Sequence, residues 1–103
     1  MTGAMITTMH ADVIVYTLDN RIHPEKLSTM TGSLLDLGEV IAEETLQKEC
    51  QFTIVENTDG RVVSLQIDDN LMLTCIANRL GNLGLVLSYG RKTADELANI
   101  MKV

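Results

Sequence analysis

Aromatic residues are scarce in this 103-residue chain, which has two tyrosines, one phenylalanine and no tryptophan. Hydrophobic residues still make up 46% of the sequence, so a folded core has to be built from Leu, Ile, Val and Met. The length is that of one domain, and we expect residues 1–103 to form a single unit.

Basic residues are also few. Eight Lys and Arg stand against fourteen Asp and Glu, which gives a net charge of −6, and the basic residues are scattered along the chain. Phosphate binding requires clustered Lys and Arg, so the sequence argues against a nucleic-acid partner. An acidic chain of this kind tolerates partners with a basic surface.

Long hydrophobic runs are missing as well. No apolar stretch approaches the roughly 18 residues of a membrane span, so membrane insertion is not expected. The first nine residues do not read as a signal peptide, because no basic region precedes them and Thr7, Thr8 and His10 interrupt them. These features predict a cytoplasmic protein.

Cysteine is limited to Cys50 and Cys75, which are widely separated and flanked by apolar or strand-like sequence. We expect two reduced, half-buried thiols. A disulfide or a shared metal remains an alternative, but no local spacing supports either.

Motifs that carry chemistry are absent. The segment Gly81-Asn82-Leu83-Gly84 lacks the Lys of a phosphate-binding loop, and we expect it to be a tight connection from strand to helix. His10 beside Asp12 suggests a surface turn, and Asp68-Asp69 has no calcium-loop spacing after it. We therefore predict no catalytic residues, no metal and no cofactor, and hence no enzyme.

Five strands are predicted from β-branched or alternating runs that end at turn residues. A turn over His10–Asp12 joins the first two, Asn57–Gly60 joins the third and fourth, and Asp68–Asn70 joins the last two. The predicted strands are Gly3–Met9, Val13–Tyr16, Cys50–Glu56, Arg61–Ile67 and Leu71–Ala77.

A long helix is predicted between the second and third strands, from Pro24 to about Leu46. At about 23 residues it would be roughly 34 Å long, whereas five strands span only about 20 Å. The helix can therefore carry the chain across the sheet from one edge to the other.

The apolar surface of this helix is wider than one sheet contact requires. One face, spaced by threes and fours, is formed by Leu27, Met30, Leu34, Leu37 and Ile41. A second strip beside it contains Thr31, Leu35, Gly38 and Ala42, and its small residues would permit the close approach of another helix. A plain core helix with a tolerated glycine is the alternative. The polar residues Glu25, Lys26, Ser33, Asp36 and Glu43 occupy the far side.

A second helix is predicted from Asn82 onward, which completes the order ββαβββα. Gly90 should weaken it in the middle. Its predicted apolar face consists of Leu83, Val86, Leu87, Ala94, Leu97, Ala98 and Met101.

Several short segments together resemble the roadblock family, which includes dynein light chains and bacterial polarity regulators that act on a Ras-like GTPase. They are Gly3-Ala4-Met5-Ile6, Leu37-Gly38-Glu39, Asp59-Gly60, Asn82-Leu83-Gly84-Leu85 and Arg91-Lys92. The resemblance implies an α+β fold, with a five-stranded antiparallel sheet, helices on its faces and the third strand at an edge. Typical members carry an extra helix before the first strand, and this chain is expected to lack it.

The resemblance also implies a function. Two copies of such proteins pair through the third strand and the long helix, so the expected homodimer interface is Thr31, Leu35, Gly38, Ala42, Gln51, Thr53 and Val55. The family implies a non-catalytic module that binds and regulates or scaffolds a Ras-like small GTPase. The expected partner surface is Glu25, Ser33, Asp36 and Glu43. Two alternatives are an assembly subunit such as a motor light chain and a sensory module for a small ligand.

Overall fold

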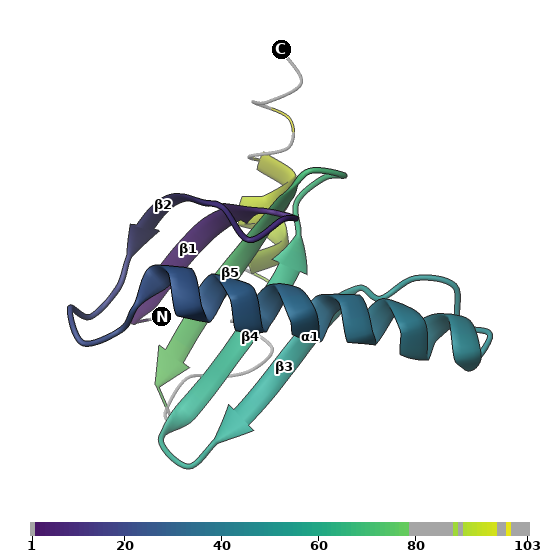
Figure 1. Cartoon of the computed structure of the whole chain (residues 1–103), viewed down its shortest axis with the longest axis horizontal. Coiled ribbons are helices and arrows are strands. Elements are labelled where there is room, and N and C mark those ends of the chain that lie inside the picture. The colour runs from purple at the N-terminus through teal and green to yellow at the C-terminus, as the bar shows by residue number, and fades with distance from the viewer. Residues whose placement is uncertain (1, 79–87, 89, 97–98, 100–103) are drawn as a thin grey trace.

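The computed structural model describes residues 2–78, 88, 90–96 and 99 (Figure 1). The expected start of the second helix at Asn82 and the segment Asn82–Leu85 lie outside these residues, as do the apolar positions predicted there, except Ala94. Residues 90–96 are helical, as the sequence predicts.

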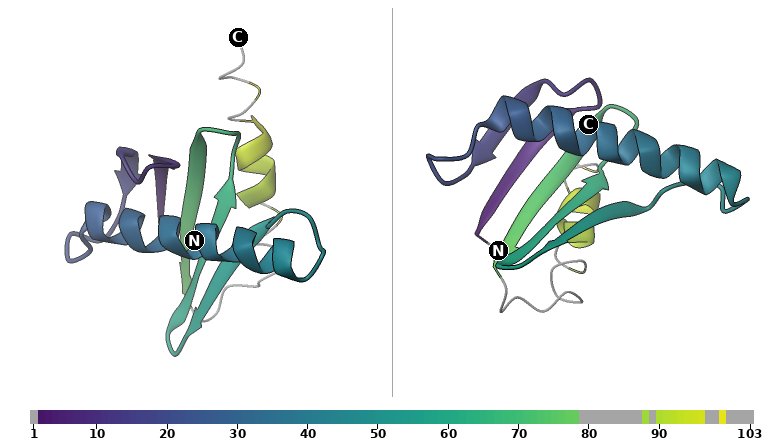
Figure 2. Two further views of the ribbon diagram at one scale, coloured as in Figure 1. Left: turned by 45° about the vertical axis from the view of Figure 1, so that its right-hand side comes forward. Right: turned by 60° about the horizontal axis from the view of Figure 1, so that its bottom comes forward.

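Five antiparallel strands form one sheet in the order β2-β1-β5-β4-β3, which confirms the predicted fold class and places β3 at an edge. The helix α1 (Pro24–Glu44) crosses one face of the sheet, and the helical residues 90–96 lie on the opposite face (Figure 2). The strands are β1 (Gly3–Thr8), β2 (Val13–Thr17), β3 (Phe52–Asn57), β4 (Gly60–Gln66) and β5 (Leu71–Asn78).

The two faces of the sheet differ in chemistry. On the face that carries residues 90–96, Val63 and Leu65 pack with Ala77, and Leu73 and Cys75 pack with Ala94. On the α1 face the register places Met5, Met72, Ser64 and Thr74, all buried, and the hydroxyls of Ser64 and Thr74 share a hydrogen bond of 3.2 Å.

The β1–β2 turn is closed by backbone hydrogen bonds between Thr8 and Asp12 and between Ala11 and Thr8, and by the Thr8 hydroxyl. Thr8 Oγ1 accepts hydrogen bonds from the backbone N–H groups of His10 at 3.2 Å and Asp12 at 3.1 Å. Ala11 then adopts a left-handed conformation with φ of 72°, where glycine is the preferred residue. His10 is exposed in this turn, which confirms its surface position.

Replacing Ala11 with Gly is expected to raise the free energy of unfolding by about 1 kcal/mol, because glycine adopts this φ without the steric penalty of a Cβ. Urea denaturation measures the gain. His10→Gly is the matched control in the same turn, since His10 has no positive φ, and it should give no gain. Equal effects of the two changes would show that the left-handed residue carries no strain.

Candidate interaction site

The inward face of α1 is the strip of small residues. Ser28, Thr31, Leu35 and Ala42 are buried in the structure, with exposed fractions of 0%, 5%, 1% and 6%. Thr31 Oγ1 donates to the carbonyl of Leu27 at 2.9 Å, which satisfies the hydroxyl inside the helix. Thr31, Leu35 and Ala42, expected to contact a second helix, are thus buried within their own subunit and leave little surface for that contact.

Gly38 belongs to the same inward strip. A Cβ added at Gly38 would lie 2.7 Å from Cys50 Sγ and 3.4 Å from Thr53 Cγ2. The glycine thus allows the segment that leads into β3 to approach the helix within the same chain. Thr53 is half-buried on the helix side of β3, whereas Gln51 and Val55 are exposed.

The apolar flank of α1, defined here as Leu27, Met30, Leu34, Leu37 and Ile41, has two half-buried residues, Leu27 and Leu34, and three exposed ones. Met30 is 62% exposed, Leu37 55% and Ile41 53%. Its alternating spacing of three and four residues is the pattern of a helix seam that packs against another helix. The sequence contains two strips with this spacing, at positions 27-30-34-37-41 and 28-31-35-38-42. The spacing alone does not indicate which strip packs against the sheet.

The second half of α1 extends past β3, so that the helix overhangs the edge of the sheet (Figure 1). The overhang and the edge strand enclose an open groove of about 420 Å³, to which Leu37, Ile41 and Phe52 contribute. Among the described residues β3 pairs only with β4, so one side of its backbone has no strand partner there. An exposed apolar seam and an unpaired strand edge thus line one groove.

The acidic flank of α1, defined here as Glu25, Ser33, Asp36 and Glu43, lies on the other side of the helix. All four residues are exposed. Glu25, Asp36 and Glu43 are separated by eleven and seven residues, which places them on one side of an α-helix. Within the described ranges, the ion pairs are Asp19–Arg21 and Glu56–Arg61, and neither involves this flank.

Both thiols are free, as predicted. Burial raises the pKa of the Cys50 thiol, and the nearby Glu39 carboxylate raises it further. Burial likewise raises the pKa of the Cys75 thiol. The thiolate is the reactive form of cysteine, so these environments oppose a nucleophilic role.

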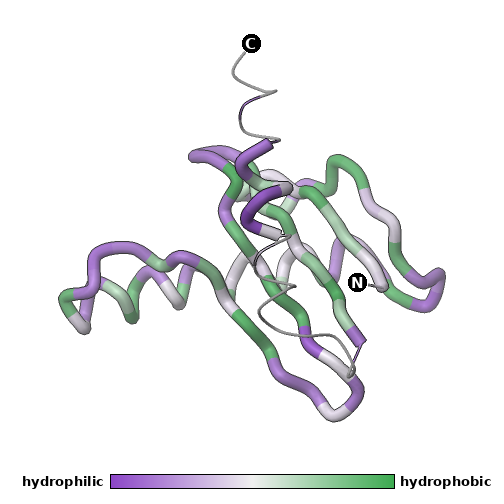
Figure 3. The backbone as a smooth tube through the Cα atoms, turned by 180° about the vertical axis from the view of Figure 1, so that it is seen from behind, coloured by the Kyte–Doolittle hydropathy of each residue, from purple (hydrophilic) through white to green (hydrophobic). Residues whose placement is uncertain are grey.

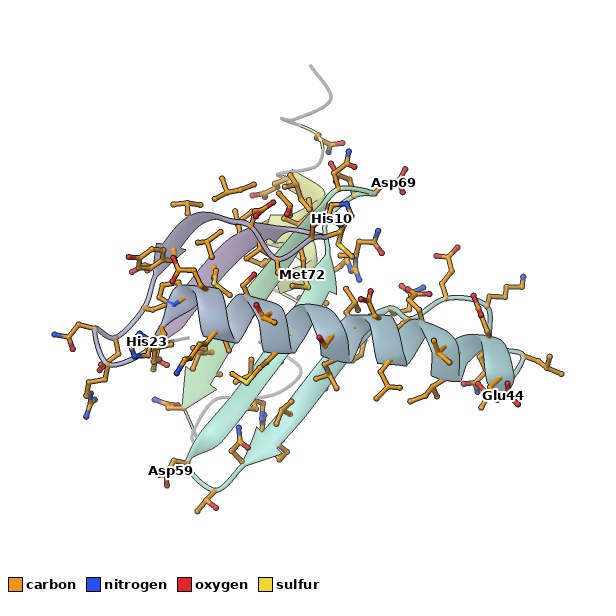
Figure 4. All side chains as sticks on the ribbon, in the orientation of Figure 1. His10, His23, Glu44, Asp59, Asp69 and Met72 are labelled. Atoms are coloured by element: carbon orange, nitrogen blue, oxygen red, sulfur yellow. The ribbon has the colours of Figure 1, made fainter. Side chains whose placement is uncertain are left out.

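Metal ligands do not gather in the described part of the chain, where no group of three His, Cys, Asp or Glu side chains is placed to hold an ion. His10 and His23 lie in separate loops (Figure 4). Asp68 serves its turn, where Oδ1 accepts hydrogen bonds from the N–H groups of Asn70 at 2.7 Å and Leu71 at 2.9 Å. No helix among the described residues is long and apolar enough to cross a membrane.

Similarity to known proteins is found at the level of structure. No protein-family profile matches the sequence, and no curated protein matches it either. Solved structures do match, and they include a roadblock/LC7 domain from Streptomyces avermitilis with a TM-score of 0.85 and 15% identity. That comparison covers 99% of this chain and 86% of the other. The chain therefore has the roadblock/LC7 fold.

The similarity extends to particular proteins with this fold. Myxococcus xanthus MglB matches with a TM-score of 0.89 at 18% identity, over 98% of this chain and 83% of that chain. A structure described as MglB with a tetrameric arrangement matches with a TM-score of 0.84 at 16% identity, over 96% of this chain and 76% of that chain.

Proposed function

We propose that this protein is a homodimeric, non-catalytic interaction module that binds a Ras-like small GTPase. The observation that carries the proposal is the division of α1 into three faces: a buried inward strip, an exposed apolar flank beside a free strand edge, and an exposed acidic flank. The first face holds the helix on its own sheet, so the other two are available for partners.

The apolar flank and the β3 edge are proposed as the homodimer interface. A second copy related by a two-fold axis would pair its β3 antiparallel with this one and place its α1 alongside, in an isologous contact. The pairing supplies hydrogen-bond partners to the free edge, and the seam buries Leu37 and Ile41. Gln51 and Val55, exposed on or beside the edge strand, stay in the proposed interface, and Thr53 stays at its inner side.

Support for self-association comes from two sources. The exposed apolar residues Leu37, Ile41, Phe52 and Val55 lie on the overhang of α1 and on β3, next to one groove or within it. One structure with the same fold is described as MglB in a tetrameric arrangement, so an assembly of copies occurs with this fold.

The acidic flank is proposed as the GTPase platform. It remains outward when the opposite flank meets a second copy, and it would attract a basic patch and speed association at low salt. Each exposed charge pair contributes only about 0 to 1 kcal/mol, so most of the affinity must come from apolar contacts. Val40, 58% exposed next to this flank, is placed to supply one.

The double variant Asp36→Lys with Glu43→Lys tests this platform. We expect it to remain dimeric and to bind the Ras-like GTPase of the same organism about tenfold more weakly, chiefly through slower association. Binding kinetics against the GTP-loaded and GDP-loaded forms give the measurement. The matched control is Asp95→Lys with Glu96→Lys, which makes the same charge change at exposed positions on the other face of the sheet.

Unchanged binding of the Asp36→Lys, Glu43→Lys dimer in both nucleotide states would place the GTPase elsewhere. Loss of binding in the Asp95→Lys, Glu96→Lys control alone would move the site to the face of the sheet opposite α1. If the parent protein itself does not bind the GTPase, the GTPase proposal is wrong, and a role as an assembly subunit remains.

A further inference from the structure

The C-terminus of α1 is closed by a Schellman arrangement. Gln47 N–H donates to the Ala42 carbonyl at 2.8 Å, and Leu46 N–H donates to the Glu43 carbonyl at 3.1 Å. In this arrangement the residue directly before Gln47 adopts a left-handed conformation. Here that residue is Leu46, with φ of 60°. Glycine is the usual residue at this position because it has no Cβ to clash.

Leu46 is unfavourable at this position within the monomer. A bulky side chain in the left-handed region is strained, and its side chain gains almost no contact in return, because Leu46 is 92% exposed. Lys48, two residues later, is also left-handed with φ of 73°, but a charged side chain in a loop has an evident reason to face solvent. A strained, exposed leucine has none within the monomer.

We propose that Leu46 is an anchor that contacts a second copy of this chain. The inference rests on the proposed homodimer and adds to its interface one residue that lies outside the apolar flank and the strand edge. The overhanging end of α1 lies beyond β3 and so has none of its own sheet beneath it (Figure 3). In the proposed dimer, the second copy's sheet continues into that space.

The antiparallel arrangement of the two helices sets what Leu46 meets. Suppose that Ile41 lies opposite Leu37 of the second copy. Because the helices are antiparallel, Leu46, five residues after Ile41, then lies opposite the position five residues before Leu37 in the second copy's helix. That position lies between Met30 and Leu34 on the apolar flank, where Met30 is 62% exposed. Leu46 would cover Met30 of the second copy, and Met30 would cover Leu46 in return.

Two variants at this position separate backbone strain from the lost side chain. Leu46→Gly removes both, whereas Leu46→Ala removes the side chain and keeps the strain. We expect each to raise the dimer dissociation constant about tenfold, as truncation of an anchor residue does, measured by sedimentation over a concentration series. Lys48→Gly is the matched control, because it relieves the same kind of strain nearby, and it should leave the constant within about twofold.

Stability is read separately in a monomeric background carrying Ile41→Lys. There Leu46→Gly and Lys48→Gly should each raise the Tm by about 4 °C, because both free a left-handed residue, and Leu46→Ala should not. If Leu46→Gly and Leu46→Ala dimerise as tightly as the parent while Ile41→Lys is monomeric, Leu46 is not an anchor. The proposed dimer interface would stand in that case. Dimerisation of Ile41→Lys at the parent affinity would instead overturn the proposed interface, and the anchor with it.

Discussion

Ile41→Lys is expected to convert the protein from dimer to monomer, whereas Val40→Lys should leave it dimeric. The two residues are adjacent, β-branched and similarly exposed, at 53% and 58%. They differ in direction: Ile41 lines the groove beside β3, whereas Val40 is not part of its lining. A Lys at position 41 would place an unpaired charge in an apolar seam, and a Lys at position 40 would meet solvent.

The expected size of the Ile41→Lys effect is a loss of about 3 kcal/mol or more in association, which is roughly a hundredfold in the dissociation constant. Sedimentation at tens of micromolar and below measures it, with circular dichroism to confirm that both variants are folded. A parent protein that is monomeric throughout this range would refute the dimer. Equal weakening by Val40→Lys would show that the helices meet through their outermost face instead of the apolar flank.

Gly38→Leu is expected to destabilise the fold itself, by about 2 to 3 kcal/mol. A Cβ at this position already lies 2.7 Å from Cys50 Sγ, and a leucine would have to displace the segment that leads into β3. Gly32→Leu is the matched control in the same helix. A Cβ at Gly32 meets no atom within 4 Å, so the change should be neutral or add up to about 1 kcal/mol from helix propensity.

Urea denaturation of both variants at one protein concentration provides the comparison. The result also distinguishes the two strips of α1. The Gly38→Leu monomer could instead be as stable as the parent monomer and yet fail to dimerise. That result would mean that Gly38 lies in a helix–helix contact between two copies. Loss of stability in Gly38→Leu with none in Gly32→Leu would confirm that Gly38 serves the approach of its own chain.

The sequence by itself determines the order of the elements, the turns and the existence of two helical strips. Turn residues such as Asp68 act through hydrogen bonds to the residues that follow them, so their roles can be read from the neighbouring sequence. The length of the predicted helix also exceeds the width of five strands, which predicts that the helix carries the chain from one edge of the sheet to the other. These are properties of the chain over short distances.

Only the tertiary structure decided which strip of α1 faces inward. Helical periodicity fixes the angle between the strips, but their orientation depends on the surface they meet. The α1 face of the sheet presents Met5, Met72 and Thr74, all buried, and Leu35 is the largest of the buried inward side chains of α1. Leu37 and Ile41 lie outward beside β3, and this exposure places the proposed interface on the flank next to the strip that the sequence predicted to meet a second helix.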